Sequence, residues 1–160
     1  MPALKASRVD VYGTTMPAPE VATAAGYGKI VVDLRKGEGP GDFRNAVYSI
    51  LIALSKRVEQ QPKLFAKVVA AHEKAYCWAK DPKNFDEVAS IVKSKMPVAS
   101  LSDEQYRSLV THAIDIFTVR YPASGLEGWN KVMMAGGILK KPMPASVVWE
   151  HAPKTDPTCK

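Results

Sequence analysis

From residue 61 onward, large apolar residues recur every three or four positions, which is the spacing of one face of an α-helix. The predicted helices span Pro62–Lys80, 85–95, 103–117 and 125–135. Three of them have a residue type that accepts backbone hydrogen bonds at an N-cap, namely Asn84, Ser102 and Ser124. Ser102 also has Gln105 three positions later, the spacing of a capping box. This part of the chain is predicted to be a run of helices.

The first 55 residues have a different character. Their β-branched and aromatic residues are concentrated in three runs that predict strands, Val9–Gly13, Lys29–Leu34 and Asn45–Ser55. The third run is either one long strand or a strand that leads into a helix. Short helices are predicted at Pro2–Ser7 and Met16–Ala25. Helix alternating with strand is typical of an α/β fold, and two or three strands are few for an independent sheet. We therefore divide the chain into a strand–helix–strand segment at 1–55, a helical region at 56–150 and a tail at 151–160.

The net charge is +6, but the 22 Lys and Arg residues are spread along the sequence. No basic block is longer than Lys140–Lys141. Nucleic-acid-binding proteins usually cluster their basic residues beside aromatic side chains. We expect no nucleic-acid partner, and a mildly basic surface that attracts anionic solutes.

The residue types of common catalytic and metal sites lack the required spacing. His72, His112 and His151 form no metal-binding motif, and no GxSxG sequence is present. Cys77 lies in an apolar helical stretch, where a buried free thiol is expected; a disulfide with Cys159 would require an oxidising compartment. The sequence predicts no catalytic residue, no metal site and no cofactor.

One segment has the arrangement of a ligand site. The predicted strand at Val9–Gly13 leads through Thr14, Thr15 and Met16 into the next helix. In α/β proteins, ligands bind where a strand ends and a helix begins, and free amides at the helix N-terminus favour an anion. The two threonines add hydroxyl donors.

Five segments, in order, resemble the solute-binding proteins of nitrate, sulfonate and taurine ABC importers, a family with thiamine-precursor relatives. Leu4–Val11 with Met16–Pro17 is similar to the family pattern L-x-x-G-x-V-D-A … W-E/D-P. The other four segments are Gly26–Leu34, Pro62–Val69, Tyr76–Pro82 and Ala135–Leu139.

The resemblance implies the C-terminal portion of a periplasmic binding protein, a two-lobed α/β fold that clamps a small anionic solute and delivers it to a membrane permease. Thr14, Thr15 and Met16 are the solute-binding residues that it carries over. Thr15 and Met16 stand where the family has aromatic and acidic residues, and Ser7 replaces its glycine. The resemblance also implies a periplasmic location, although residues 1–8 lack the apolar segment of a signal peptide.

Two other functions are open at this point. One is an enzyme on the same scaffold, similar to a desulfinase or a thiamine-pyrimidine synthase. The other is a remnant that binds no solute and self-associates as a homodimer by exchanging its first helix and strands, because uncovered strand edges attract partners.

Overall fold

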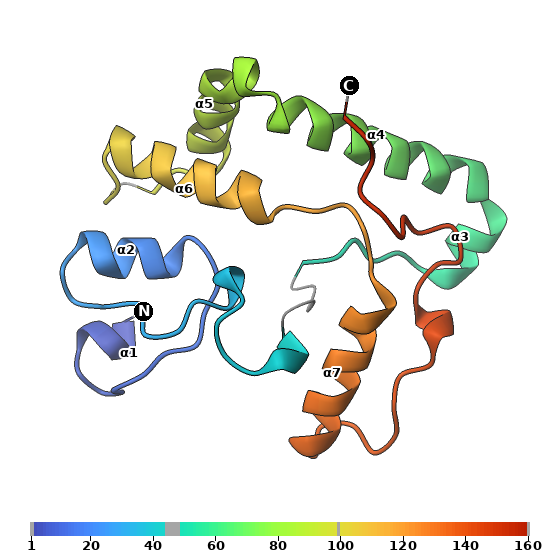
Figure 1. The fold of residues 1–160 in the computed structure, drawn as a ribbon, viewed down its shortest axis with the longest axis horizontal. Coiled ribbons are helices and arrows are strands. Elements are labelled where there is room, and N and C mark those ends of the chain that lie inside the picture. The colour runs from blue at the N-terminus through green and yellow to red at the C-terminus, as the bar shows by residue number, and fades with distance from the viewer. Residues whose placement is uncertain (1, 44–48, 99, 160) are drawn as a thin grey trace. The chain divides into compact units, whose positions relative to one another are not determined.

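The computed structural model describes residues 2–43, 49–98 and 100–159, and this part of the chain is helical without any strand (Figure 1). Helical segments make up 56% of the structure. The α-helices are α1 (Pro2–Lys5), α2 (Ala18–Ala24), α3 (Ser55–Gln60), α4 (Pro62–Lys80), α5 (Phe85–Lys95), α6 (Asp103–Ile116) and α7 (Ala123–Ala135). Four short 3₁₀ segments are η1 (Leu34–Lys36), η2 (Gly41–Phe43), η3 (Pro82–Asn84) and η4 (Ala145–Val147). No helix in the described ranges combines the length and apolar character needed to cross a bilayer.

The predicted α/β fold, with two or three short strands from a two-lobed binding protein, is therefore wrong. The described parts of the three predicted strands, 9–13, 29–33 and 49–54, are irregular backbone, and residues 45–48 lie outside the described residues. None of these stretches makes a backbone hydrogen bond to another described loop or turn. β-Propensity reflects the fit of a side chain to a pleated, half-buried surface, and these segments have no neighbouring strand to provide one.

Contacts within the chain define two compact units, and each unit is built from two separate stretches of sequence. Unit 1 comprises Met1–Asp33 and Ala79–Phe117, and unit 2 comprises Leu34–Trp78 and Thr118–Lys160. The end of α4 thus belongs to unit 1 and the rest of this helix to unit 2. The sequence-based division at residues 55 and 150 stays a prediction.

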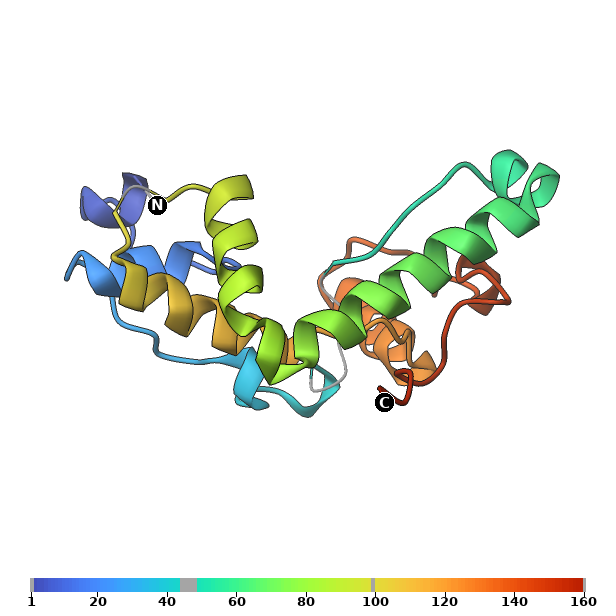
Figure 2. The same ribbon diagram turned by 90° about the horizontal axis from the view of Figure 1, so that it is seen from above.

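Unit 1 has an apolar core formed where α5 packs against α6 (Figure 2). Val110 of α6 is 1% exposed and packs with Val88 and Ala89 of α5. A second cluster of buried residues lies nearer the start of α6, where α2 also packs. Its members are Leu101, Tyr106 and Leu109. The buried positions of α6 therefore follow the helical spacing expected from the sequence.

The two ends of the α5–α6 connection are fixed by polar contacts. Ser102 and Gln105 form the predicted capping box: the Gln105 amide donates to Ser102 Oγ at 3.3 Å, and the Ser102 amide donates to Gln105 Oε1 at 2.8 Å. The buried Tyr106 hydroxyl donates to the Met96 carbonyl at 2.6 Å and accepts a bond from the Val98 amide. These bonds satisfy backbone groups that the helix ends leave free.

The other two predicted caps differ from the structure. Asn84 occupies the N-cap position of α5, but its side chain makes no capping hydrogen bond. Ser124 lies inside α7, whose N-cap residue is Pro122. Pro122 has extended backbone angles, so the helix begins directly after it, two residues earlier than the serine would place it.

Unit 2 is held mainly by close backbone approach and polar contacts. Helix α7 packs on η2, and a Cβ atom at Gly128 would lie 2.2 Å from the Asp42 carbonyl oxygen, so this approach requires glycine. Lys131 Nζ lies 2.9 Å from Asp42 Oδ1 in the same contact. Asn130 exchanges two hydrogen bonds with the backbone of Met143, at 2.8 and 3.0 Å. Among the described residues of unit 2, the buried apolar side chains are Tyr76 and Leu126.

A disulfide joins Cys77 in α4 to Cys159 in the tail, 82 positions apart. The expectation that Cys77 is a buried free thiol is therefore wrong. Cys77 is half-buried and Cys159 is exposed, so their sulfur atoms meet at the surface of unit 2.

Replacing Cys77 by Ser is expected to lower the free energy of unfolding by about 2–5 kcal/mol, because the cross-link restricts the unfolded chain across a long loop. Urea unfolding with and without a reductant measures this effect. The reductant should destabilise the parent protein to the level of Cys77→Ser and leave the variant unchanged. Equal sensitivity of both proteins would contradict the prediction.

Ser102→Ala is expected to lower the free energy of unfolding by about 1 kcal/mol, because it removes one half of the capping box. Ser108→Ala is the matched control, since Ser108 is exposed within the same helix. The control should unfold at an unchanged or slightly higher urea concentration. If both variants lose the same stability, the cap has no special contribution.

Candidate functional site

The structure separates the three predicted ligand-binding residues into two environments. Thr14 and Thr15 are exposed on the irregular segment before α2. Met16 is half-buried and packs against the Leu101, Tyr106 and Leu109 cluster. The Met16 side chain therefore contributes to the core of unit 1, while the two hydroxyl groups face solvent.

The start of α2 has little capacity for an anion. The helix has seven residues, and the carboxylate of Glu20 already occupies its first turn. A carboxylate at this position uses the favourable field of the helix N-terminus and repels a second negative charge. The role of Thr14, Thr15 and Met16 in ligand binding stays a prediction.

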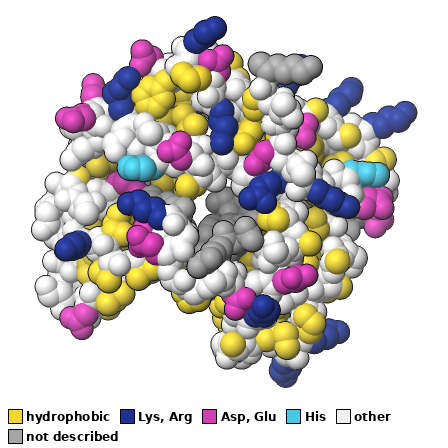
Figure 3. All heavy atoms as spheres, in the orientation of Figure 1, with side chains coloured by type: hydrophobic (Ala, Val, Ile, Leu, Met, Phe, Trp, Pro, Cys, Tyr) yellow, Lys and Arg dark blue, Asp and Glu magenta, His cyan; other side chains and the backbone are white. Residues whose placement is uncertain are grey.

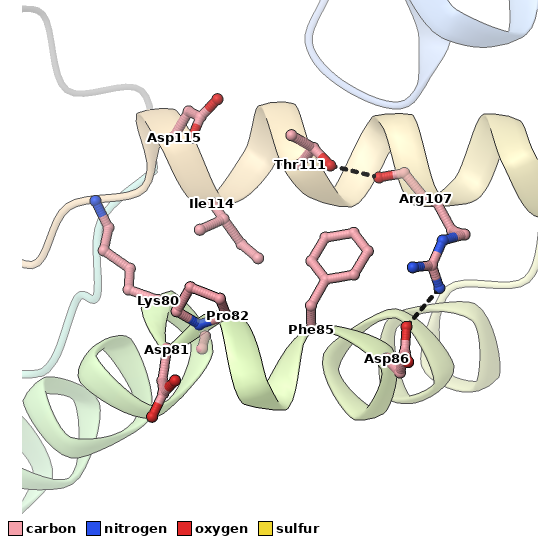
Figure 4. A pocket seen from close by; sticks show the side chains of 10 residues that line it. Lys80, Asp81, Pro82, Phe85, Asp86, Arg107, Thr111, Ile114 and Asp115 are labelled. Atoms are coloured by element: carbon pink, nitrogen blue, oxygen red, sulfur yellow. Dashed lines mark hydrogen bonds and ion pairs between the residues drawn. The ribbon is translucent and has the colours of Figure 1, made fainter.

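A surface groove of about 530 Å³ lies in unit 1 between η3, α5 and α6 (Figure 4). This volume is within the range of small-molecule sites. Its lining residues are Ala79, Lys80, Asp81, Pro82, Phe85, Asp86, Arg107, Thr111, Ile114 and Asp115. All of them belong to one continuous stretch of unit 1, so one packed element pair positions them.

The centre of the groove is apolar, and one end carries the ion pair of Arg107 and Asp86. Figure 4 shows the Phe85 ring and Ile114 facing each other across the space between α5 and α6. The guanidinium carbon of Arg107 lies 4.8 Å from the centre of the Phe85 ring, and its Nη1 donates to Asp86 Oδ1 at 2.6 Å. The Arg107 and Asp86 side chains are 53% and 84% exposed, so their ion pair contributes less than about 1 kcal/mol.

The other acidic residues of the groove point away from its apolar centre. Figure 4 shows the carboxylates of Asp81 and Asp115 directed outward, on opposite sides. Asp81 Oδ1 accepts a hydrogen bond from the Lys83 amide at 3.0 Å and caps η3. A guanidinium has five N–H donors in a planar fork, and the hydrogen bond to Asp86 uses Nη1. Arg107 can therefore also bind a carboxylate or sulfonate whose apolar part rests on Phe85 and Ile114.

Sequence reasoning did not identify this groove. Arg107, Thr111 and Ile114 lie three or four positions apart and share one face of α6, a pattern that also describes an ordinary solvated helix face. Phe85 is the first residue of α5, and from the sequence alone a phenylalanine at this position is expected in the core. Only the packing of α5 on α6 brings these residues together.

Asp156 is the half-buried carboxylate with the most hydrogen bonds in the described part of unit 2. Its Oδ1 accepts from Thr118 Oγ1 at 2.6 Å, the Val119 amide at 3.0 Å and the Arg120 amide at 3.3 Å. Burial acts to raise the pKa of Asp156, but the Thr118 hydroxyl, the two amides and the Arg120 charge outweigh it and lower the pKa below 3.8. These partners hold the tail against residues 118–120, which is a structural role.

No group of three or more His, Cys, Asp or Glu side chains within the described residues is arranged to hold a metal ion. His72 Nδ1 lies 2.8 Å from the Val68 carbonyl oxygen in its own helix. His151 stacks edge-on against Trp149, with 5.2 Å between ring centres, and lies beside Glu150.

Comparison with known proteins gave no match to any family model, curated protein or solved structure.

Asp156→Asn is expected to destabilise the protein near neutral pH and to have less effect in acid. The pKa of Asp156 is lower in the folded chain than in the unfolded chain, so the carboxylate contributes stability above its unfolded pKa. That contribution is lost as the pH falls through the folded pKa. Urea unfolding between about pH 6 and pH 2 should show the difference between parent and variant shrinking. Parallel stability curves would contradict this assignment.

Proposed function

We propose that this chain is a solute-binding component of an ABC importer for small anions such as sulfonates and nitrate. The proposal depends on the five segments between Leu4 and Leu139 that resemble this family in the same order. The protein would bind the solute reversibly and deliver it to a permease, without making or breaking covalent bonds.

The disulfide supports a location outside the reducing cytoplasm. Structural disulfides persist in oxidising compartments such as the bacterial periplasm. Cys77 and Cys159 are joined although they lie 82 positions apart. This bond is the structural support for a periplasmic protein.

The position of Arg107 in the groove is the observation that favours an anionic ligand. Its guanidinium borders the Phe85 ring, and Ile114 lies on the other side of that ring. The exposed ion pair of Arg107 with Asp86 is weak enough to be shared with a ligand. A sulfonate presents three oxygens to such a fork, and its organic part can cover the apolar centre. Nitrate has no organic part and gains only the polar contacts. We therefore place the organic sulfonates ahead of nitrate as solutes.

The experiment is a thermal-shift titration with benzenesulfonate, taurine, methanesulfonate and nitrate. A solute at 100 times its dissociation constant should stabilise the protein by about 2.7 kcal/mol. We expect the largest rise in Tm with benzenesulfonate, loss of that rise in Arg107→Gln, and retention of it in Thr14→Val/Thr15→Val.

Arg57→Gln is the matched control, because it removes one exposed arginine from unit 2 and leaves the groove intact. It should keep the full shift, which separates local recognition from the effect of net charge. Absence of a shift with every anion would overturn the proposed function. A shift lost in the threonine variant and kept in Arg107→Gln would move the solute to the segment before α2.

A further inference from the structure

Helix α4 carries a stripe of exposed apolar side chains along most of its length. Its members lie three or four positions apart and therefore share one face of the helix: Leu64, Val68, Ala71, Ala75 and Trp78. Leu64, Val68 and Trp78 are 50, 37 and 38% exposed, and both alanines are exposed. At about 1.5 Å per residue the stripe is roughly 21 Å long, so it is a continuous apolar surface open to solvent.

A row of lysines borders this stripe on one side. Lys63, Lys67 and Lys74 each directly precede a stripe residue, so each lies about 100° around the helix from it, in the same direction. All three are exposed, and none forms an ion pair with another residue that the structure describes. Figure 3 shows basic side chains that project into solvent at the upper right, where α4 lies. The sequence of α4 has one acidic residue, Glu73, which precedes Ala75 by two positions and so lies roughly opposite the stripe.

The other side of the stripe faces the protein itself. Phe65, Val69 and Tyr76 each directly follow a stripe residue, which places them on the side away from the lysines. Phe65 and Val69 are half-buried, and Tyr76 is buried. A flat anionic surface can therefore contact the stripe and the lysines together without displacing these packed side chains.

We propose that α4 is a docking surface for a bilayer that contains anionic lipids. The helix would lie in the plane of the membrane, with the stripe toward the acyl chains and the lysines against the headgroup phosphates. Amphipathic helices that combine a basic polar face with leucine and tryptophan on the apolar face bind membranes in this way. The lysine stems can lie along the apolar surface while their ammonium groups stay among the headgroups.

A hollow at the start of α4 favours lipid over a protein partner. It has a volume of about 250 Å³ and is lined by Arg57, Gln61, Leu64 and Phe65. Leu64 also belongs to the stripe, so the hollow continues the apolar surface. A flexible acyl chain can fill this hollow and cover the small alanines without a matched shape, and a guanidinium such as that of Arg57 binds phosphate well. A partner helix would need side chains that fit both features.

This inference goes beyond the proposed solute binding and does not depend on it. The stripe belongs to unit 2, whereas the groove with Arg107 lies in unit 1. Membrane binding is measured without any solute, so failure of one proposal leaves the other unaffected.

The experiment measures binding of the full chain to vesicles of phosphatidylcholine alone and of equal parts of phosphatidylcholine and phosphatidylglycerol. We expect binding to the phosphatidylglycerol vesicles, weakened by salt because salt screens the lysine charges. Lys67→Gln/Lys74→Gln should lower the partition coefficient at least about tenfold, since each basic residue near an anionic surface contributes about fivefold. Lys140→Gln/Lys141→Gln removes the same charge from two exposed lysines outside α4 and should keep the binding.

A second pair of variants tests the apolar contribution. Leu64→Gln/Val68→Gln should weaken binding to the same vesicles, because it removes apolar surface from the stripe. Ile138→Gln is the matched control, since Ile138 is 72% exposed and follows α7. The tryptophan emission of the parent chain should shift to the blue on binding, and Trp78→Phe should bind without that shift.

Circular dichroism checks that the variants keep the helical content of the parent. A parent chain that does not bind the phosphatidylglycerol vesicles would overturn the proposal. Equal loss of binding in Lys67→Gln/Lys74→Gln and Lys140→Gln/Lys141→Gln would also overturn it, because net charge alone would then explain the effect. Binding to a helical peptide rich in glutamate and leucine, without binding to vesicles, would identify a protein partner instead of a membrane.

Discussion

Each backbone amide and carbonyl needs a hydrogen-bonding partner. This constraint separates the helices of the protein from its irregular apolar segments. A helix satisfies that need within one segment, whereas a strand requires a neighbour. The sequences from Pro62 to Lys80 and from Asp103 to Ile116 supply their own bonds and form long helices. The segments at 9–13, 29–33 and 49–54 have β-branched or apolar sequences, but no described segment pairs with them. Their large apolar side chains stay exposed, so helices alternate along the sequence with irregular apolar segments.

The two units obtain their stability from different sources. Unit 1 buries apolar side chains between α5 and α6, with Val110 almost fully enclosed. Unit 2 depends on a covalent cross-link, on the fit of Gly128 against the backbone of η2, and on the carboxylate of Asp156. The stability that comes from apolar burial changes little with pH. The contribution of a disulfide depends on redox conditions, and that of a carboxylate depends on pH. The two units should therefore respond differently to the same change of solution.

Sequence reasoning predicted the parts of the fold that local information determines. The helices from Pro62 onward and the capping box at Ser102 are confirmed, because periodic apolar spacing and capping chemistry act over a few residues. The strands were wrong, because a strand is decided by its neighbours and not by its own residues. The Arg107 groove was missed, and the Cys77–Cys159 disulfide was only an alternative to the expected free thiol, because each needs a tertiary contact. Thr14 and Thr15 are exposed as a ligand contact requires, while Met16 packs in the core.

The Tyr106 hydroxyl has a consequence for the dynamics of unit 1. It bonds the carbonyl of Met96 and the amide of Val98, the first residues after α5, although Tyr106 itself belongs to the first turns of α6. The last turn of α5 can therefore fray only if α6 also releases its tyrosine. In hydrogen exchange, amides at the end of a helix usually exchange earliest, because they open without the rest of the fold. We therefore expect the end of α5 and the start of α6 to open together, with similar protection of their amides from exchange.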